Sequence, residues 1–196
     1  MIVNENVQAR HDAIAGGSVV FSPDGSRMAY AARADGKWFF VIDGKAGNQY
    51  DRLGAQFAFS PDGERLAYWA SEGAGSFVFV DGERHGPYDG IYDGPVFSPD
   101  GRNVAYAARR GRDWSVFLNG KAGITHSGLV TGARIVFDSA DRFHYLVGRR
   151  WGDSALIHLV EERLAREAGP RACALFSGRL ISTCPGLPAV EELIQK

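Results

Sequence analysis

The sequence FSPDGSRMAYAA, residues 21–32, recurs along the chain with little change. FSPDGERLAYWA begins at Phe59 and FSPDGRNVAYAA begins at Phe97, so that these copies lie 38 residues apart. A divergent copy, FDSADRFHYLV, begins at Phe137, 40 residues further on. A period of about 40 residues indicates an array in which each repeat forms one small unit that stacks on the next.

Each repeat has the composition of four short strands. β-Branched and aromatic residues dominate segments such as WFFVI at 38–42 and FVFV at 77–80, as buried strands require. Ser-Pro-Asp-Gly predicts a tight turn between the first two strands. Asp43-Gly44, Asp81-Gly82 and Asn119-Gly120 predict two-residue type I′ hairpins between strands three and four. A repeated four-stranded antiparallel sheet of this kind is the blade of a β-propeller.

The two ends of the chain continue the pattern beyond the four repeats. Residues 172–176 match a first strand and residues 178–183 a second, whereas Ile2 and Val3 match a third strand. We therefore predict an all-β, five-bladed propeller over residues 1–184, whose last blade joins N-terminal strands three and four to C-terminal strands one and two. A four-bladed ring with frayed ends and an open fragment of a larger propeller are the alternatives. Apolar spacing in residues 185–196 predicts a short helical tail.

FSPDG followed by an alanine-tyrosine strand, with Val-Asp-Gly and Tyr-Asp-Gly further along, resembles the WD40-like repeat of TolB-type β-propellers. The resemblance is strong from about residue 21 to residue 147. It implies an interaction platform, and the best-known members of the family are periplasmic. We expect no peptidase activity, because the sequence holds no serine-hydrolase domain of the kind that accompanies such propellers in peptidases.

The composition excludes several classes of protein. Of 196 residues, 45% are hydrophobic and 23% charged, as in ordinary globular domains. A net charge of −1 argues against general nucleic-acid binding. No apolar run approaches the roughly 18 residues of a membrane span and no secretory signal is evident, so we expect a cytoplasmic protein, or a periplasmic one if a signal was removed. No motif predicts a cofactor or a metal. Cys173 and Cys184 fall in one predicted hairpin, which leaves a disulfide open.

The loops between strands two and three differ among the repeats and form the predicted binding face. The loops of repeats one, three and four carry basic and aromatic residues, whereas the loop of repeat two, residues 71–75, has no basic residue. Arg and Trp anchor many interfaces, and Arg binds carboxylate or phosphate through two hydrogen bonds. Solvated arginines and tryptophans packed between blades are the alternatives. The predicted face comprises Trp38, Arg109, Arg110, Arg112, Trp114, Arg149, Arg150 and Trp151.

A second set of polar residues is expected at the mouth of the propeller channel. Asp12, Asp51 and Asp89 lie in the linkers between blades, and Arg134 precedes the Phe137 anchor by three residues. Separated carboxylates can serve as acid and base in glycoside hydrolysis, but such a pair needs unequal environments, which equivalent positions do not promise. Arg134 can hold a small anion, or it can be satisfied by neighbouring carbonyl groups or water.

These features favour a non-catalytic binding module for a protein partner or a small anionic ligand. A glycosidase-like hydrolase at the channel mouth is one alternative. A lectin is another, although a lectin needs similar pockets in every blade and the loops here differ. The predicted C-terminal helix offers a surface for a homodimer.

Overall fold

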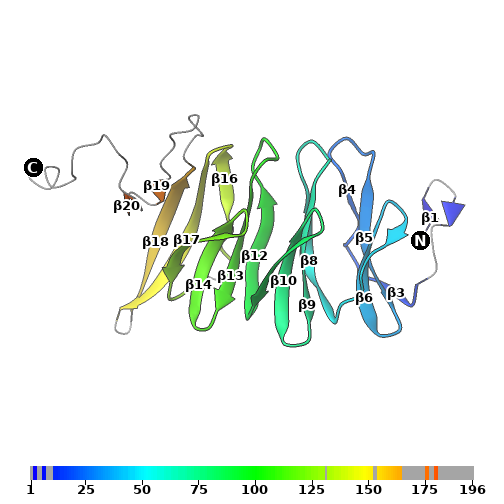
Figure 1. Ribbon diagram of the computed structural model, residues 1–196, viewed down its shortest axis with the longest axis horizontal. Helices are drawn as coiled ribbons and strands as arrows, with labels where there is room; N and C mark the ends of the chain where they lie inside the picture. The colour runs from blue at the N-terminus through cyan, green and yellow to red at the C-terminus, as the bar shows by residue number, and fades with distance from the viewer. Residues whose placement is uncertain are drawn as a thin grey trace, which may run out of the picture.

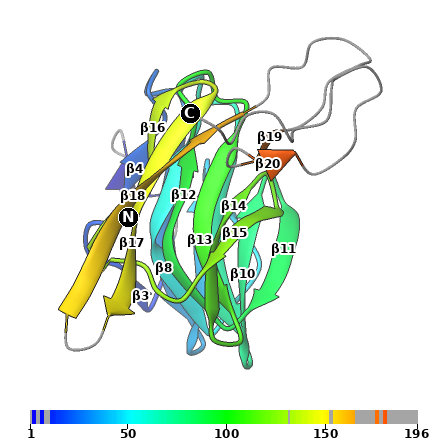
Figure 2. The same ribbon diagram turned by 90° about the vertical axis from the view of Figure 1, so that its left-hand side faces the viewer.

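The structure is a computed structural model that describes residues 2–3, 6–7, 11–130, 132–151, 154–164, 175–176 and 179–180. Strands account for nearly all of its regular structure, and no helix able to span a membrane occurs among these residues. Four antiparallel sheets stand side by side in chain order (Figure 1), and they overlap when seen along the row (Figure 2).

Each sheet is one blade, and a small hairpin lies beyond each end of the row. Blade 1 contains β3 (Ala13–Ile14), β4 (Val20–Phe21), β5 (Met28–Ala34), β6 (Lys37–Ile42) and β7 (Lys45–Ala46). Blade 2 contains β8 (Arg52–Phe59), β9 (Leu66–Glu72), β10 (Gly75–Val80) and β11 (Glu83–Tyr88). Blade 3 contains β12 (Gly90–Phe97), β13 (Val104–Arg110), β14 (Asp113–Leu118) and β15 (Lys121–His126). Blade 4 contains β16 (Val136–Ser139), β17 (Arg142–Trp151) and β18 (Ser154–Arg163). The hairpins are β1 (Ile2–Val3) with β2 (Asn6–Val7), and β19 (Leu175–Phe176) with β20 (Arg179–Leu180).

The turns have the conformations that their residues predict. In the hairpin between strands three and four of blade 2, Asp81 and Gly82 have φ values of 52° and 86°. Two successive positive φ values define a type I′ turn, whose twist matches that of the flanking strands. Positive φ at Asp43-Gly44 and Asn119-Gly120 confirms the same turn in blades 1 and 3.

Neighbouring blades pack large side chains against small ones. Tyr106 of β13 is fully buried against blade 2, where it lies close to Val78 and Ala67. On the other face of β13, Ala105 and Ala107 pack with aromatic side chains of blade 4 such as Tyr145. The alternation of small and large residues in the strand sequence AYAA therefore produces two different faces, one for each neighbouring blade.

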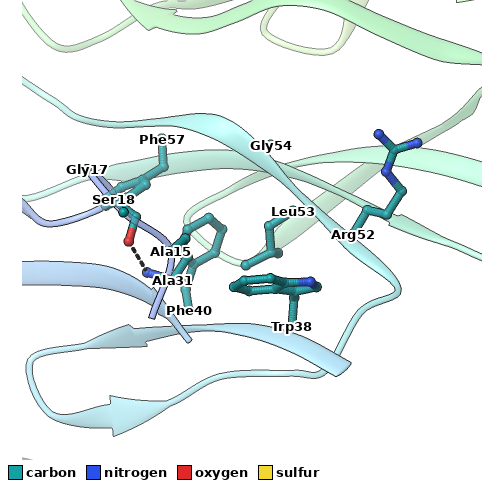
Figure 3. A pocket seen from close by; sticks show the side chains of 11 residues that line it. Ala15, Gly17, Ser18, Ala31, Trp38, Phe40, Arg52, Leu53, Gly54 and Phe57 are labelled. Carbon is teal, nitrogen blue, oxygen red and sulfur yellow. Dashed lines mark hydrogen bonds between the residues drawn. The ribbon is translucent and has the colours of Figure 1, made fainter. Parts of the chain in front are cut away.

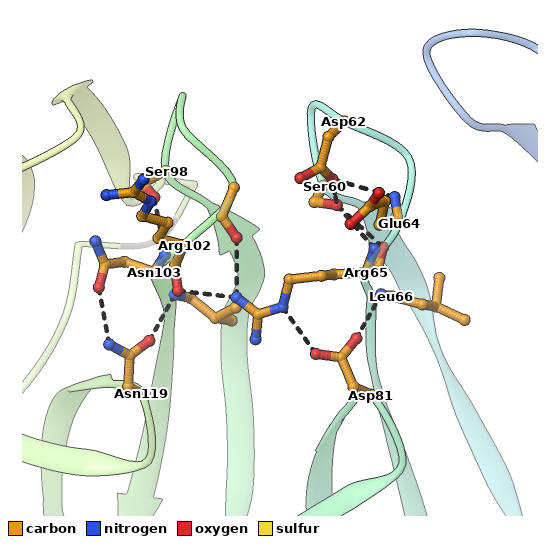
Figure 4. A network of polar contacts seen from close by, with 12 residues as sticks. Ser60, Asp62, Glu64, Arg65, Leu66, Asp81, Ser98, Arg102, Asn103 and Asn119 are labelled. Atoms are coloured by element: carbon orange, nitrogen blue, oxygen red, sulfur yellow. Dashed lines mark hydrogen bonds and ion pairs between the residues drawn. The ribbon is translucent and has the colours of Figure 1, made fainter.

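Arginine side chains directly before the second strands tie adjacent blades together (Figure 4). Arg65 donates from Nε to the Asp81 carboxylate at 2.8 Å. Its Nη1 reaches blade 3, where it donates to the carbonyl oxygens of Gly101 and Arg102 at 2.9 and 2.8 Å. Arg27 makes the equivalent contacts from blade 1 to blade 2. Blade 3 has a neutral version, in which Asn119 donates to Asn103 and Asn103 donates to the Ala140 carbonyl oxygen.

We expect Arg65→Asn to lower the free energy of unfolding by about 1–3 kcal/mol, because charge-assisted hydrogen bonds to two carbonyl groups are lost. Adding Asp81→Asn reproduces the Asn103–Asn119 pair of blade 3 and should recover part of the loss. Urea denaturation of the single and double variants measures both effects. Equal losses in the two variants would contradict the assigned pairing.

The predicted closure into a five-bladed ring stays a prediction, because most residues of the expected shared blade lie outside the described residues. Two terminal hairpins are present, with Val3 opposite Asn6 and Phe176 opposite Arg179. They belong to separate two-stranded sheets at opposite ends of the row (Figure 1), so the expected shared blade is absent from the described residues. The predicted tail helix and both cysteines lie outside the described residues.

Candidate functional site

The linker carboxylates cap turns between strands two and three. Asp12, Asp51 and Asp89 each accept a hydrogen bond from a backbone N–H of the turn between strands two and three of the blade they enter. The distance is 2.7 Å from Gly73 N to Asp51 and 2.6 Å from Gly111 N to Asp89. Three equivalent carboxylates therefore share one structural role, whereas an acid–base pair needs two different environments.

Asp51 has an additional partner. The Lys37 ammonium group, which hydrogen-bonds this carboxylate, holds the pKa of Asp51 below its ordinary value, and the Gly73 N–H acts in the same direction. Asp51 is thus an ionised group whose charge is already paired. This environment does not suit a general acid.

The residue before each linker aspartate hydrogen-bonds a tyrosine of the next blade. Tyr88 and Tyr106 join their hydroxyl groups at 2.8 Å. In blade 4 the equivalent pair is His126 Nε2 and the Tyr145 hydroxyl, 3.1 Å apart. The Tyr145 hydroxyl also donates to the buried Glu162 carboxylate at 2.6 Å.

Burial lowers the pKa of His126 below 6.5. Because a depressed histidine pKa means that the unfolded chain binds the proton more tightly, this contribution to stability is present above pH 6.5 and declines as the pH falls below that value. We expect His126→Tyr, which installs the residue found at positions 50 and 88, to weaken the loss of stability between about pH 7.5 and pH 5.5. Urea denaturation at both pH values measures the effect, with His158→Gln as the exposed control. An unchanged pH dependence in His126→Tyr would contradict this assignment.

The turns between strands two and three line one edge of the row, which we call the hairpin edge (residues 33–38, 71–76 and 109–114). Arg33 lies opposite Trp38, and Arg109 lies opposite Trp114, in equivalent cross-strand pairs. Each guanidinium group stands over its indole ring, at 5.9 Å in blade 1 and 5.7 Å in blade 3. Arg33 lies in the basic loop of repeat one but is not among the residues of the predicted face.

The predicted arginines have different surroundings. Arg109 donates weakly to the Asp89 carbonyl oxygen, and its buried Nε has no hydrogen-bond partner among the described residues. Arg110 lies over the rings of Tyr88 and Phe117, at 5.0 and 5.3 Å. Arg112 is exposed at the tip of its turn. The backbones of Arg149, Arg150 and Trp151 lie in β17, and their side chains are outside the described part of the chain.

The two tryptophans of the predicted face also differ. Trp114 packs edge-on against Tyr92, with ring centroids 5.8 Å apart, so it belongs to the packing of the blades. Trp38 instead forms a wall of a cavity of about 340 Å³ between blades 1 and 2 (Figure 3). Phe40, Phe57 and Leu53 supply further apolar walls, and Arg52 borders the cavity with its guanidinium group directed away from Trp38 (Figure 3).

The cavity exists because two positions of blade 1 carry small residues. Ala31 occupies the position that Trp69 holds one repeat later. The Trp69 ring presses so closely on Gly54 that a Cβ atom there would lie 2.2 Å from the indole nitrogen. A Cβ atom at the equivalent Gly16 would meet no atom within 4 Å.

Between blades 3 and 4 the same space is filled in another way. Tyr92, two repeats after Gly16, crosses to blade 4 and donates to the Val130 carbonyl oxygen at 2.6 Å. A cavity of only about 10 Å³ remains there, beside the exposed Arg134. The pocket of blade 1 is therefore not repeated in the other described blades, which argues against a lectin with one site per blade.

No protein-family model matches the chain, and no curated protein matches it. Among solved structures, the β-propeller domain of the Trilobed protease from Pyrococcus furiosus aligns with a TM-score of 0.52 at 13% identity, over 75% of this chain and 58% of that one. The chain has a β-propeller fold. TolB from Acinetobacter baumannii (TM-score 0.47, 18% identity, 78% of this chain and 41% of that one) and a putative TolB from Agrobacterium tumefaciens (0.42, 16%, 77% and 62%) are also similar.

This β-propeller spans less than two thirds of the length of each of these structures. Identities of this size show the fold alone. The expected β-propeller fold is thus confirmed, while the site of this propeller rests on its own residues.

Proposed function

We propose that the chain is a non-catalytic binding module that holds an anionic ligand on its hairpin edge. One contrast supports this function. The linker carboxylates beside that edge accept hydrogen bonds from its turns. The guanidinium groups of Arg33 and Arg112 on the edge, and of Arg52 opposite Ser71, have no hydrogen bond or ion pair with the residues that the structure describes. An unpaired guanidinium group beside aromatic rings favours carboxylate or phosphate groups.

The test compares three proteins by native mass spectrometry after incubation with a small-molecule extract of the host cell. They are the wild type, an edge variant (Arg33→Glu with Arg112→Glu) and the control Arg102→Glu, whose side chain is 86% exposed beside a Ser-Pro-Asp-Gly turn at the opposite edge. We expect an anion bound to the wild type and to the control but lost from the edge variant. Equal retention by all three proteins, or none by any of them, would refute the proposal.

The same variants separate the alternative functions. A protein partner would be captured from lysate by the wild type and released by the edge variant, while the small-molecule spectra stay empty. A hydrolase would turn over chromogenic glycosides and lose that activity in Asp51→Asn. We expect no such turnover, because Asp51 is ion-paired to Lys37.

A further inference from the structure

We infer that the cavity between blades 1 and 2 binds a planar aromatic acid, with its ring against Trp38 and its carboxylate at Arg52. This inference deepens the proposed function by naming the site and the class of ligand. It depends on the walls of the cavity, on the charge at its rim and on the repeats that lack it.

The walls suit a flat ring. Trp38, Phe40 and Phe57 contribute aromatic side chains to a cavity whose volume of about 340 Å³ lies near the lower end of the roughly 300–1,000 Å³ typical of small-molecule sites. Aromatic groups pack well in stacked or edge-on arrangements against such rings. The Ser18 hydroxyl accepts a hydrogen bond from the Ala31 N–H at 3.0 Å (Figure 3), so this polar group of the wall already has a donor.

The rim supplies positive charge. Arg52 is exposed, and it has neither an ion pair nor a hydrogen bond with the described part of the chain. Arg33 adds a second guanidinium group over the Trp38 ring. Because Arg52 is exposed, its side chain can turn toward Trp38 and meet a carboxylate of an aromatic ligand whose ring lies in the cavity.

The repeats show that this combination is specific to one interface. The equivalents of Arg52 are Ile14, Gly90 and Gly128, none of which carries a charge. Trp69 and Tyr92 fill the corresponding space at the other interfaces. The interface between blades 1 and 2 thus has both an open cavity and an arginine beside it, a combination that the other described interfaces lack.

The test is a ligand-observed NMR titration with 3-indolepropionate, its uncharged amide and acetate. The variants are Ala31→Trp, Gly16→Tyr and Arg52→Gln, with Arg102→Gln as the control. Ala31→Trp and Gly16→Tyr introduce side chains that the repeat already accommodates, and Gly16 has open space for a Cβ atom. Melting curves identify any variant that fails to fold. If one of the two filling variants fails to fold, the other still tests the inference.

We expect the wild type to bind the acid about ten times more tightly than the amide, and to bind acetate too weakly to detect. Either filling variant should weaken binding of the acid at least about tenfold. Arg52→Gln should weaken binding of the acid but leave binding of the amide unchanged. Failure of the wild type to bind the acid, or unchanged binding in a folded filling variant, would overturn the inference. If the edge variant still loses its cellular ligand while Ala31→Trp keeps it, the proposed function stands and the cavity is not its site.

Discussion

Tyr106→Ala is expected to lower the free energy of unfolding by about 3–5 kcal/mol, the range for removing a large buried aromatic side chain. Tyr106 is fully buried, and its ring stacks on Phe117 with centroids 5.2 Å apart and planes 1° from parallel. It fills the interface between blades 2 and 3, so its loss leaves a cavity that the rigid sheets cannot close. Urea denaturation monitored by circular dichroism measures the change.

Tyr106→Phe is the matched control for the ring. It keeps the packing and removes only the hydroxyl group that bonds Tyr88 at 2.8 Å. We expect a loss of about 1–2 kcal/mol, because the buried Tyr88 hydroxyl is left without this partner. If the alanine variant costs no more than the phenylalanine variant, the interface between these blades does not carry the stability assigned to it.

Gly94→Ala should be the next most damaging change, with an expected loss of about 3–4 kcal/mol. Gly94 has a φ of 90°, which L-residues rarely adopt, and that conformation alone costs about 1–2 kcal/mol. A Cβ atom there would also lie 2.9 Å from the Ala105 carbonyl oxygen and from Tyr106 Cα. Those atoms belong to the backbone of β13, so relief requires the strand to move.

Gly132→Ala separates the cost of the backbone conformation from the cost of the close contact with β13. Gly132 has a similar φ of 84°, but a Cβ atom there would meet no atom within 4 Å. We expect it to cost only the conformational part, about 1–2 kcal/mol. Thermal and urea unfolding of both variants give the comparison, and equal losses would show that close packing against β13 contributes nothing.

The repeats made much of the blade architecture predictable. Ser-Pro-Asp-Gly and the Asp-Gly or Asn-Gly pairs specify turns through local chemistry, which is why their conformations could be read from sequence. The bridging role of Arg65 was missed, although a signal exists: Arg is paired with Asp in repeats one and two, and Asn with Asn in repeat three. The ring closure was also inferred from repeat matching, and it stays a prediction, because closure depends on the curvature of the whole row, which no short motif encodes.

The candidate site was only partly accessible to sequence reasoning. Trp38 was selected because it lies beside a variable loop, and the structure places it in the cavity wall. Gly16 and Ala31 were not selected, because small residues carry no chemistry of their own. Their significance appears only when the fold places them opposite the space that Tyr92 and Trp69 fill elsewhere. Comparing side-chain size at equivalent positions of the repeats would have shown the difference.

The location of ligand binding tests the central claim most directly. ¹H–¹⁵N spectra of the uniformly labelled chain, recorded during a titration with 3-indolepropionate, report which backbone amides sense the ligand. The account predicts shifts at residues 16–18, 31, 38 and 52–54, with none at the Ser-Pro-Asp-Gly turns of the opposite edge. Shifts confined to that opposite edge, or no shifts at all, would contradict it.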